Sequence, residues 1–277
     1  MDTLIFLAPP LVACLLLVAA LGYFGNHILT RGVIFVDIAV AQVAALGTML
    51  GIWLGGQEGS LTVSLFSLGF TLSVVALFAL LKTEHKEISK EVIIGVIYCM
   101  ALGLAYLLVD RVSGGSNFIQ KTFTGAILWV TWKDIIRLLI IISPILALHV
   151  WLSNSLIKMT TGKAGQMPKT THLSLELFFY ITFGIIVVEA VKIGGIFVVF
   201  MFLIAPAAMA SFLTETWKGR FIYSTLLGAL GTILGLVISY KYNLPNGPTL
   251  VCTLGLMLLI ISLTTRQTGS PEFQRRS

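Results

Sequence analysis

Charged residues are scarce in this sequence. Asp, Glu, Lys and Arg make up 11% of the 277 residues, whereas 57% are hydrophobic and the mean hydropathy is +0.98. Ordinary soluble domains are about 25% charged. The shortage of charge therefore excludes an ordinary soluble domain and indicates a polytopic membrane protein.

The charges that are present do not form a patch. The formal net charge is +6, which on its own is compatible with nucleic-acid binding. The basic residues are instead scattered through short connections, without interleaved aromatic residues. We therefore expect no nucleic-acid partner and interpret the basic residues as topology signals.

Cysteine and catalytic motifs are also sparse. Cys14, Cys99 and Cys252 lie in apolar runs, with no CxxC pattern and no neighbouring histidine, so we expect small buried hydrophobes rather than a disulfide framework. The chain has no GxxxxGK[ST] phosphate-binding loop, no catalytic constellation and no soluble domain. It is therefore not expected to be an enzyme, and any energy-requiring process in which it takes part must draw on another subunit or an ion gradient.

Long apolar runs dominate what remains. About 20 apolar residues cross a hydrocarbon core of about 30 Å, and the sequence predicts about nine spans within one transmembrane domain, 1–268. The polar connection 110–133 is expected to contain a short surface helix. The last residues, 269–277, look like a vector-derived tail. The predicted spans are 4–25, 31–54, 61–81, 92–109, 135–152, two within 175–213, 222–240 and 250–263.

Two spans are predicted within 175–213 because this stretch is too long for one. EAVKIGG, at 189–195, fits a tight Gly-Gly turn between them; one span plus a re-entrant segment, giving eight in all, stays open. Glu189 and Lys192 can pair on one helix face, although Glu189 also remains a candidate for the translocation path. Pro206, flanked by alanines, kinks a helix and permits close packing, so it is a second path candidate.

Basic residues are divided unevenly between the two sides. Alternating spans put ten on one side and five on the other, and the positive-inside rule assigns the richer side to the cytoplasm. The N-terminus is then external. The richer side holds Arg31, Lys82, Lys86, Lys90, Lys158, Lys163, Lys169, Lys218, Arg220 and Arg266, and the poorer side holds Arg111, Lys121, Lys133, Lys192 and Lys241.

The second predicted span carries an acid. Asp37 lies inside the apolar run, where an ionisable group costs at least roughly 3 kcal/mol on insertion scales, so it must face protein, a cavity or a pathway. Ala41, Ala44 and Thr48 follow it at i+4, i+7 and i+11 as a stripe of small residues. We expect this stripe to line the translocation path. By contrast, His149, near the end of the fifth span, is expected to be an interfacial hydrogen-bonding residue.

Three segments together resemble the membrane subunit of metal-type ABC transporters, the zinc and manganese uptake permease family. AVKIGGIFVVFMFLIAPAAMASFL is similar to the family pattern AVKxVGxLLVxALLxxPAAxA. RGVIFVDIAVAQVAALG is similar to RRxxFVGDALSHAVLPG, and YKYNLPNGPTLV to SYYLDLPSGPxIV. The resemblance runs from about residue 4 to about residue 264 and implies a type II ABC importer permease-like bundle.

The resemblance also implies a metal site, from which this sequence departs. The family has an acid and a histidine four residues apart on its second span. Without a gap, Ile38 and Gln42 occupy those two positions, and Asp37 takes the preceding glycine position. One residue turns a helix by about 100°, so Asp37 and Gln42 are roughly 140° apart. Their oxygens still make them the candidate metal contacts.

The resemblance implies partners as well. It predicts a homodimer in the bacterial inner membrane, two cytoplasmic ATP-binding subunits that carry ATP and Mg, and an extracellular or periplasmic substrate-binding protein. No cofactor would be bound by this chain. Where the family has an acidic helix that docks on the ATPase, 159–172 is basic here, so an acidic groove is expected on the partner. The candidate coupling residues are Lys158, Lys163, Gln166 and Lys169.

Other classes of function remain open. An ion-coupled secondary transporter needs intramembrane acids to relay ions, and only Asp37 and Glu189 are available. An ABC permease for a non-metal substrate fits the departure at Ile38. An intramembrane scaffold predicts that Asp37→Asn changes nothing. We expect import of a divalent metal such as zinc or manganese.

Overall fold

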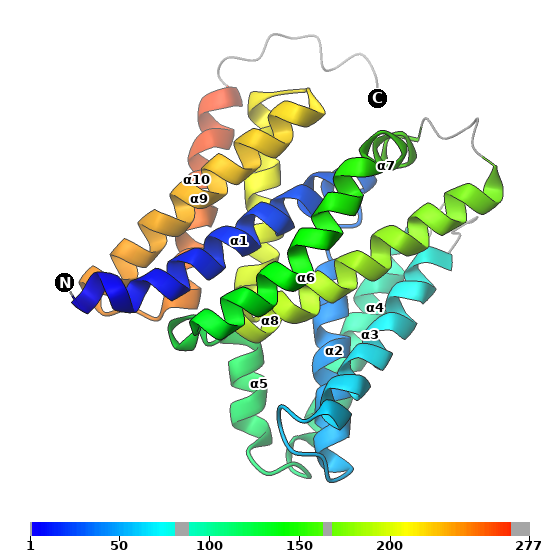
Figure 1. Cartoon of the computed structure of the whole chain (residues 1–277), viewed down its shortest axis with the longest axis vertical. Helices are drawn as coiled ribbons and strands as arrows, with labels where there is room; N and C mark the ends of the chain where they lie inside the picture. The colour runs from blue at the N-terminus through cyan, green and yellow to red at the C-terminus, as the bar shows by residue number, and fades with distance from the viewer. Residues whose placement is uncertain (1, 81–88, 163–167, 267–277) are drawn as a thin grey trace.

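The computed structural model describes residues 2–80, 89–162 and 168–266, and within these ranges it contains helices and no strand. Eight of the described helices are long and apolar enough to cross a membrane, which confirms the all-α polytopic fold class (Figure 1). The elements are α1 (Asp2–Arg31), α2 (Val36–Trp53), α3 (Leu61–Leu80), α4 (Lys90–Val109), α5 (Gly115–Thr124), the 3-10 turn η1 (Ile127–Trp129), α6 (Trp132–Trp151), α7 (Ser153–Thr160), α8 (Lys169–Leu213), α9 (Trp217–Tyr242) and α10 (Asn246–Arg266).

Helix α8 contains the predicted turn between two spans. It is 45 residues long, but Gly195 inside it has φ 74° and ψ 167°, which is not helical. Figure 1 shows α8 as two arms that meet at a sharp bend. The second arm, 196–213, measures about 27 Å at 1.5 Å per residue, close to the hydrocarbon thickness of about 30 Å. The eight long helices therefore provide nine apolar segments.

Successive segments run in opposite directions, so helix ends gather at two opposite ends of the bundle. At the α7 end, which also holds the turn between α1 and α2, the Ile34 amide donates to Glu91 Oε1 at 2.7 Å. At the α5 end, which also holds the bend of α8, the Ala126 amide donates to the Ile193 carbonyl at 2.9 Å. The described helix ends that carry the basic residues of the richer side all lie at the α7 end.

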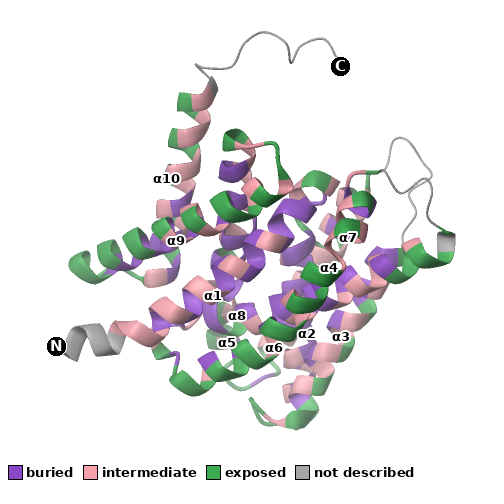
Figure 2. Ribbon diagram, turned by 45° about the horizontal axis from the view of Figure 1, so that its top comes forward, coloured by how far each residue is buried: buried purple, intermediate pink, exposed green. Residues whose placement is uncertain are grey.

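The centre of the bundle is formed by α1, α2 and α8. Phe24, Phe179, Phe183 and Phe202 are fully buried between them, and 67% of the α2 span is buried, against 17% for α4 and 22% each for α6 and α10. Figure 2 shows the buried residues along the central helices and the exposed ones along the outer helices. Because lipid tails are as apolar as these side chains, close packing rather than exclusion from water holds such helices together.

Helices α2 and α3 meet most closely at glycines. A Cβ atom at Gly47 would lie 2.8 Å from the Phe66 carbonyl oxygen, and one at Gly51 would lie 3.0 Å from Val63 Cα. No larger residue fits at these two positions without a shift of α3. Helix α2 therefore uses its glycines to approach α3, and its alanine stripe lies beside this contact, with Ala44 only about 20° around the helix from Gly51.

Several features differ from the sequence-based expectations. Cys14 is buried, but Cys99 and Cys252 are exposed. His149 is fully buried rather than interfacial; its Nε2 lies 2.8 Å from Thr182 Oγ1 and its Nδ1 lies 3.3 Å from Tyr23 Oη. An apolar run shows that a residue lies at membrane depth, but not whether it faces lipid or protein. The expected surface helix in 110–133 is present as α5.

Candidate translocation site

A cavity of about 290 Å³, here called the α2 cavity, lies near the α5 end between α2, α3, α5, α6 and the first arm of α8. Ala41, Ala44 and Thr48 of α2 line it, so the predicted stripe faces a cavity rather than a neighbouring helix. The other lining residues are Ala45, Glu58, Gly59, Val63, Ser64, Ser67, Phe118, Lys121, Thr122, Arg137, Val188, Val191 and Lys192.

The hydroxyl groups of Thr48 and Ser67 line the α2 cavity. Ser67 Oγ, from α3, and Thr48 Oγ1 each donate to the Ala44 carbonyl oxygen at 3.0 Å. Because each hydroxyl donates its single hydrogen to that carbonyl, the lone pairs of the hydroxyl oxygen remain available as acceptors. Oxygen atoms of this kind suit a hydrated cation or the donor groups of a polar solute.

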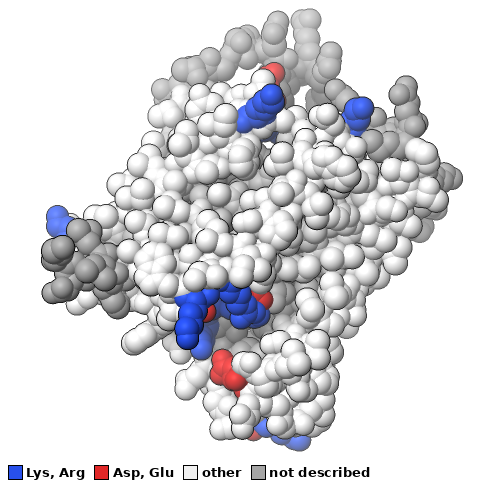
Figure 3. Space-filling view, in the orientation of Figure 1, with Lys and Arg blue, Asp and Glu red and all other residues white. Residues whose placement is uncertain are grey.

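Charged side chains also lie along the α2 cavity, four of them lining it. Arg137 Nη2 and Lys192 Nζ both donate to Glu189 Oε1, at 2.9 Å and 2.7 Å, and Lys121 Nζ lies 3.6 Å from Glu58 Oε1. Figure 3 shows basic and acidic side chains together over the N-terminal end of α6, on a face that is otherwise nearly uncharged.

The Glu189–Lys192 pair confirms the spacing argument, whereas the third member, Arg137, was not expected. The Glu189 side chain is only 12% exposed, and a carboxylate that is mostly buried needs charged partners. Two cations on one carboxylate leave little negative charge to attract a metal ion. Glu189 therefore holds α6 to the first arm of α8 beside the cavity, and does not line the cavity itself.

Asp37 lies in the first turn of α2, one turn before Ala41, because the helix begins at Val36 and not at Arg31 as predicted. Helical spacing puts the two residues about 40° apart around the axis, and Asp37 is 1% exposed. Its Oδ1 atom has no hydrogen-bond partner among the described residues. Asp37 does not border the α2 cavity; it lies one turn nearer the α7 end than Ala41, on the same side of α2.

Gln42 belongs to a different face of α2. Ile38, about 40° from Gln42, borders a second and apolar hollow of about 580 Å³ between α2 and α4, with Phe35, Val96 and Met100. Gln42 is 2% exposed and its Oε1 has no hydrogen-bond partner among the described residues. Because α2 is a regular helix, Asp37 and Gln42 stay roughly 140° apart and do not share one face.

Pro206 lies away from both hollows. It is in the second arm of α8, and its ring lies 3.1 Å from the position of a Cβ atom at Gly228 of α9. The side chain is thus packed in a helix contact. This placement gives Pro206 a packing role. The sequence predicts that it lines the path, but it borders neither the α2 cavity nor the hollow between α2 and α4.

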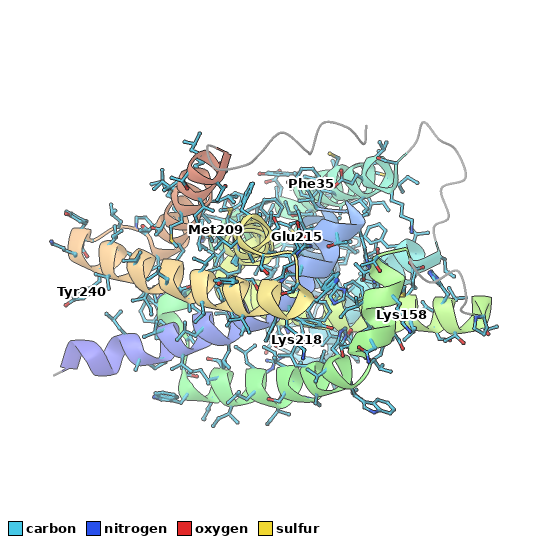
Figure 4. The ribbon with its side chains drawn as sticks, turned by 90° about the horizontal axis from the view of Figure 1, so that it is seen from above. Phe35, Lys158, Met209, Glu215, Lys218 and Tyr240 are labelled. Carbon is cyan, nitrogen blue, oxygen red and sulfur yellow. The ribbon has the colours of Figure 1, made fainter. Side chains whose placement is uncertain are left out.

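The predicted coupling residues are only partly described. Lys158 is exposed on α7, and Figure 4, which looks down on the α7 end, shows it there together with Lys218 at the start of α9. Lys163 and Gln166 lie outside the described residues, and so does the side chain of Lys169. Helix α7 itself is not predicted from the sequence, because a segment of eight mostly polar residues is too short to show a periodic apolar pattern.

A family model described as the ABC 3 transport family matches residues 3–265. The chain belongs to this family. The resemblance inferred from three short motifs is therefore confirmed across nearly the whole of this chain, and the chain is a multi-pass membrane permease of a transport family.

Relatives and solved structures agree with this assignment. The chain is 23% identical to the manganese transport system membrane protein MntC of Listeria monocytogenes, over 95% of this chain and 92% of that protein. It is 24% identical to the manganese import system permease protein ScaB of Streptococcus gordonii, over 92% and 90% of the two chains. A chain of PsaBC from Streptococcus pneumoniae, solved in complex with Fab, superposes with a TM-score of 0.75 at 24% identity and covers 94% of this chain and 93% of that one. The last comparison shows the fold.

Proposed function

We propose that this chain is the translocating subunit of an ATP-driven importer for a divalent transition metal, manganese or zinc. The observation that carries the proposal is the ABC 3 family match over residues 3–265, and relatives named for manganese transport support the choice of metal. Two copies would form the path in a bacterial inner membrane, with two cytoplasmic ATPases and an external substrate-binding protein. The N-terminus and the α2 cavity would be external, because the α7 end collects the basic connections.

Asp37 and Gln42 would contact the metal at separate steps of the path. Both have a buried side-chain oxygen without a hydrogen-bond partner among the described residues, and such an oxygen is costly unless it binds something. Carboxylate and amide oxygens suit a hard divalent cation such as Mn²⁺. Asp37, on the face of the alanine stripe, would receive the ion from the α2 cavity.

A second candidate is an ABC permease for an anionic or chelated solute. Three basic side chains border the α2 cavity, Lys121, Arg137 and Lys192, against one acid, Glu58. No group of three or more His, Cys, Asp or Glu residues placed to hold a metal is found among the described residues. This candidate shares the ATPase coupling of the first and differs only in the substrate.

Uptake by the assembled complex tests the proposal. An ATPase subunit is expected to copurify with the chain, and vesicles containing both, with the binding protein, should accumulate Mn²⁺ or Zn²⁺ only when ATP is supplied. Accumulation driven by a proton or sodium gradient, without any ATPase, would instead identify a secondary transporter. ATP-driven uptake that requires an anionic metal complex would favour the second candidate.

Variants in the same vesicles test the metal contacts. Asp37→Ala removes a buried carboxylate and is expected to lower metal uptake at least about tenfold, since a hydrogen bond or ligand bond to a charged group is worth about 1.5–3 kcal/mol. Gln42→Ala should have a smaller effect. Asp110→Ala, at an exposed acid after α4, serves as the control, and equal uptake by all three variants would remove the proposed contacts.

Cysteine labelling tests whether the α2 cavity is wet and external. In a chain with Cys14, Cys99 and Cys252 replaced by alanine, Thr48→Cys is expected to react with a membrane-impermeant thiol reagent added outside the cell. Ser73→Cys, at an exposed position of α3, should not react, because a thiol in hydrocarbon does not ionise. Labelling of Thr48→Cys only from the cytoplasmic side would reverse the orientation.

A further inference from the structure

Thr160 ends α7 at a buried polar contact that joins α7 to α1. The residue is 8% exposed, and its Oγ1 atom lies 2.7 Å from His27 Nδ1. The same oxygen accepts from Arg31 Nη2 at 3.2 Å and from Arg31 Nε at 3.3 Å. One hydroxyl of α7 therefore contacts two side chains of α1.

Arg31 is held in place from the other side by aromatic rings. Its guanidinium carbon lies 4.0 Å from the centre of the Phe179 ring and 5.7 Å from that of Tyr180, both in the first arm of α8. A cation over an aromatic face is attracted to it. A buried cation also needs hydrogen-bond acceptors, and Thr160 supplies one, so the position of Arg31 depends on both α7 and α8.

His27 extends the same contact to α9. Its ring lies 4.8 Å from that of Trp217, the first residue of α9, and 5.6 Å from that of Phe179. The side chains of α1, α8 and α9 thus meet around the Thr160 hydroxyl. We call Thr160, His27, Arg31, Phe179 and Trp217 the Thr160 node.

The remaining buried contacts of α7 are apolar. Besides Thr160 only Leu156 and Met159 of this helix are buried, while Asn154 and Lys158 are exposed. Hydrogen bonds hold their partners within a narrow range of distance and angle, so a displacement of α7 that keeps the bonds of Thr160 must carry His27 and Arg31 with it. A displacement of α7 is therefore passed on most directly through the hydroxyl of Thr160.

We propose that Thr160 is a positioning residue that transmits movement of α7, on the proposed ATPase side, to α1 and to the first arm of α8. The inference rests on the proposed function. The first arm of α8 also borders the α2 cavity through Val188 and Val191, so the Thr160 node links the α7 end to the helix that forms a wall of the α2 cavity. Thr160 acts through Arg31 and His27 and does not contact the substrate.

The test compares transport with ATP consumption in one preparation. Thr160→Val keeps the shape of the side chain and removes the hydroxyl, and Thr160→Ser keeps the hydroxyl. In vesicles containing the chain, its ATPase and the binding protein, Mn²⁺ uptake and ATP hydrolysis are measured together. Thr160→Val is expected to lower the Mn²⁺ transported per ATP about tenfold, with ATP hydrolysis retained, while Thr160→Ser stays within about twofold of the wild type.

A purely structural role would give a different result. If Thr160→Val left the Mn²⁺ transported per ATP unchanged, whether both rates fell equally or neither fell, the inference would be overturned. Thr160→Ala provides a second variant without the hydroxyl, and failure of both it and Thr160→Val to assemble, while Thr160→Ser assembles, would also count against it. A wild-type complex without ATP-driven uptake would refute the proposed function instead, so the two failures are distinguishable.

Discussion

Gly195→Ala is expected to prevent the chain from reaching its folded state. Gly195 has φ 74° and ψ 167°, a conformation that is essentially restricted to glycine. A Cβ atom there would also overlap the Gly125 amide nitrogen and would lie 2.6 Å from the Phe123 carbonyl oxygen. Backbone strain of about 1–3 kcal/mol and overpacking of about 1–3 kcal/mol fall on one residue, and together they remove a large part of the roughly 5–15 kcal/mol that stabilises a typical domain.

Gly194→Ala is the matched control. It adds the same methyl group one residue earlier, in the helical first arm of α8, where the nearest atom to the new Cβ would be Val198 Cγ1 at 3.3 Å. A side chain can give way there, while backbone cannot. In detergent extracts, the yield of monodisperse protein should fall sharply for Gly195→Ala and little for Gly194→Ala. The thermal midpoint of the protein that does fold should follow the same order. Similar behaviour of the two variants would show that the bend does not need glycine.

The bend also shows how far local sequence patterns reach. EAVKIGG predicts a break in an apolar stretch that is too long for one span, and that inference uses only length and two adjacent glycines. The pattern contains no hint that Gly125, which also has a positive φ of 74°, packs against Gly194 and Gly195. A close contact between segments distant in the chain depends on tertiary packing, which helical periodicity cannot supply.

The α2 cavity follows the same division. Ala41, Ala44 and Thr48 are predicted to share a face because the helical repeat is local, and all three border the cavity. The pairing of Arg137 with Glu189 joins α6 to α8 and needs the folded arrangement. His149 illustrates the converse, because hydropathy gives its depth while its burial beside Tyr23 and Thr182 depends on which side of α6 faces α1 and α8.

The three hydrogen-bonded contacts at Thr160 were missed for a related reason. His27 and Arg31 are one helical turn apart on α1, so their common face is visible in the sequence. Thr160 lies far along the chain in a polar stretch that reads as a loop. A basic residue followed by apolar sequence is ordinarily assigned to the membrane surface, and only the stacking on Phe179 shows that Arg31 is held inside the bundle.

Gly25 carries the second large effect, because it allows α1 to touch the second arm of α8. A Cβ atom at Gly25 would overlap the Leu203 carbonyl oxygen, with the Ala207 Cβ 3.2 Å away. The contact is between the backbone of α1 and the backbone of α8, so it can be relieved only if these two central helices move apart. We expect Gly25→Ala to lower the free energy of unfolding by about 3 kcal/mol or more, at the upper end of overpacking costs, and to reduce the yield of folded permease.

Gly22→Ala, one turn earlier on α1, is expected to have the opposite sign. Its Cβ would meet Ser224 Oγ at 3.4 Å, an ordinary contact, and alanine favours a helix over glycine by about 1 kcal/mol. Thermal unfolding of the two purified variants should therefore bracket the wild type, with Gly22→Ala at or above it and Gly25→Ala well below. If Gly25→Ala unfolded at the wild-type temperature, α1 and the second arm of α8 could not lie as close at Gly25 and Leu203 as the structure places them. The packing around Leu203, on which the placement of that arm depends, would then be wrong.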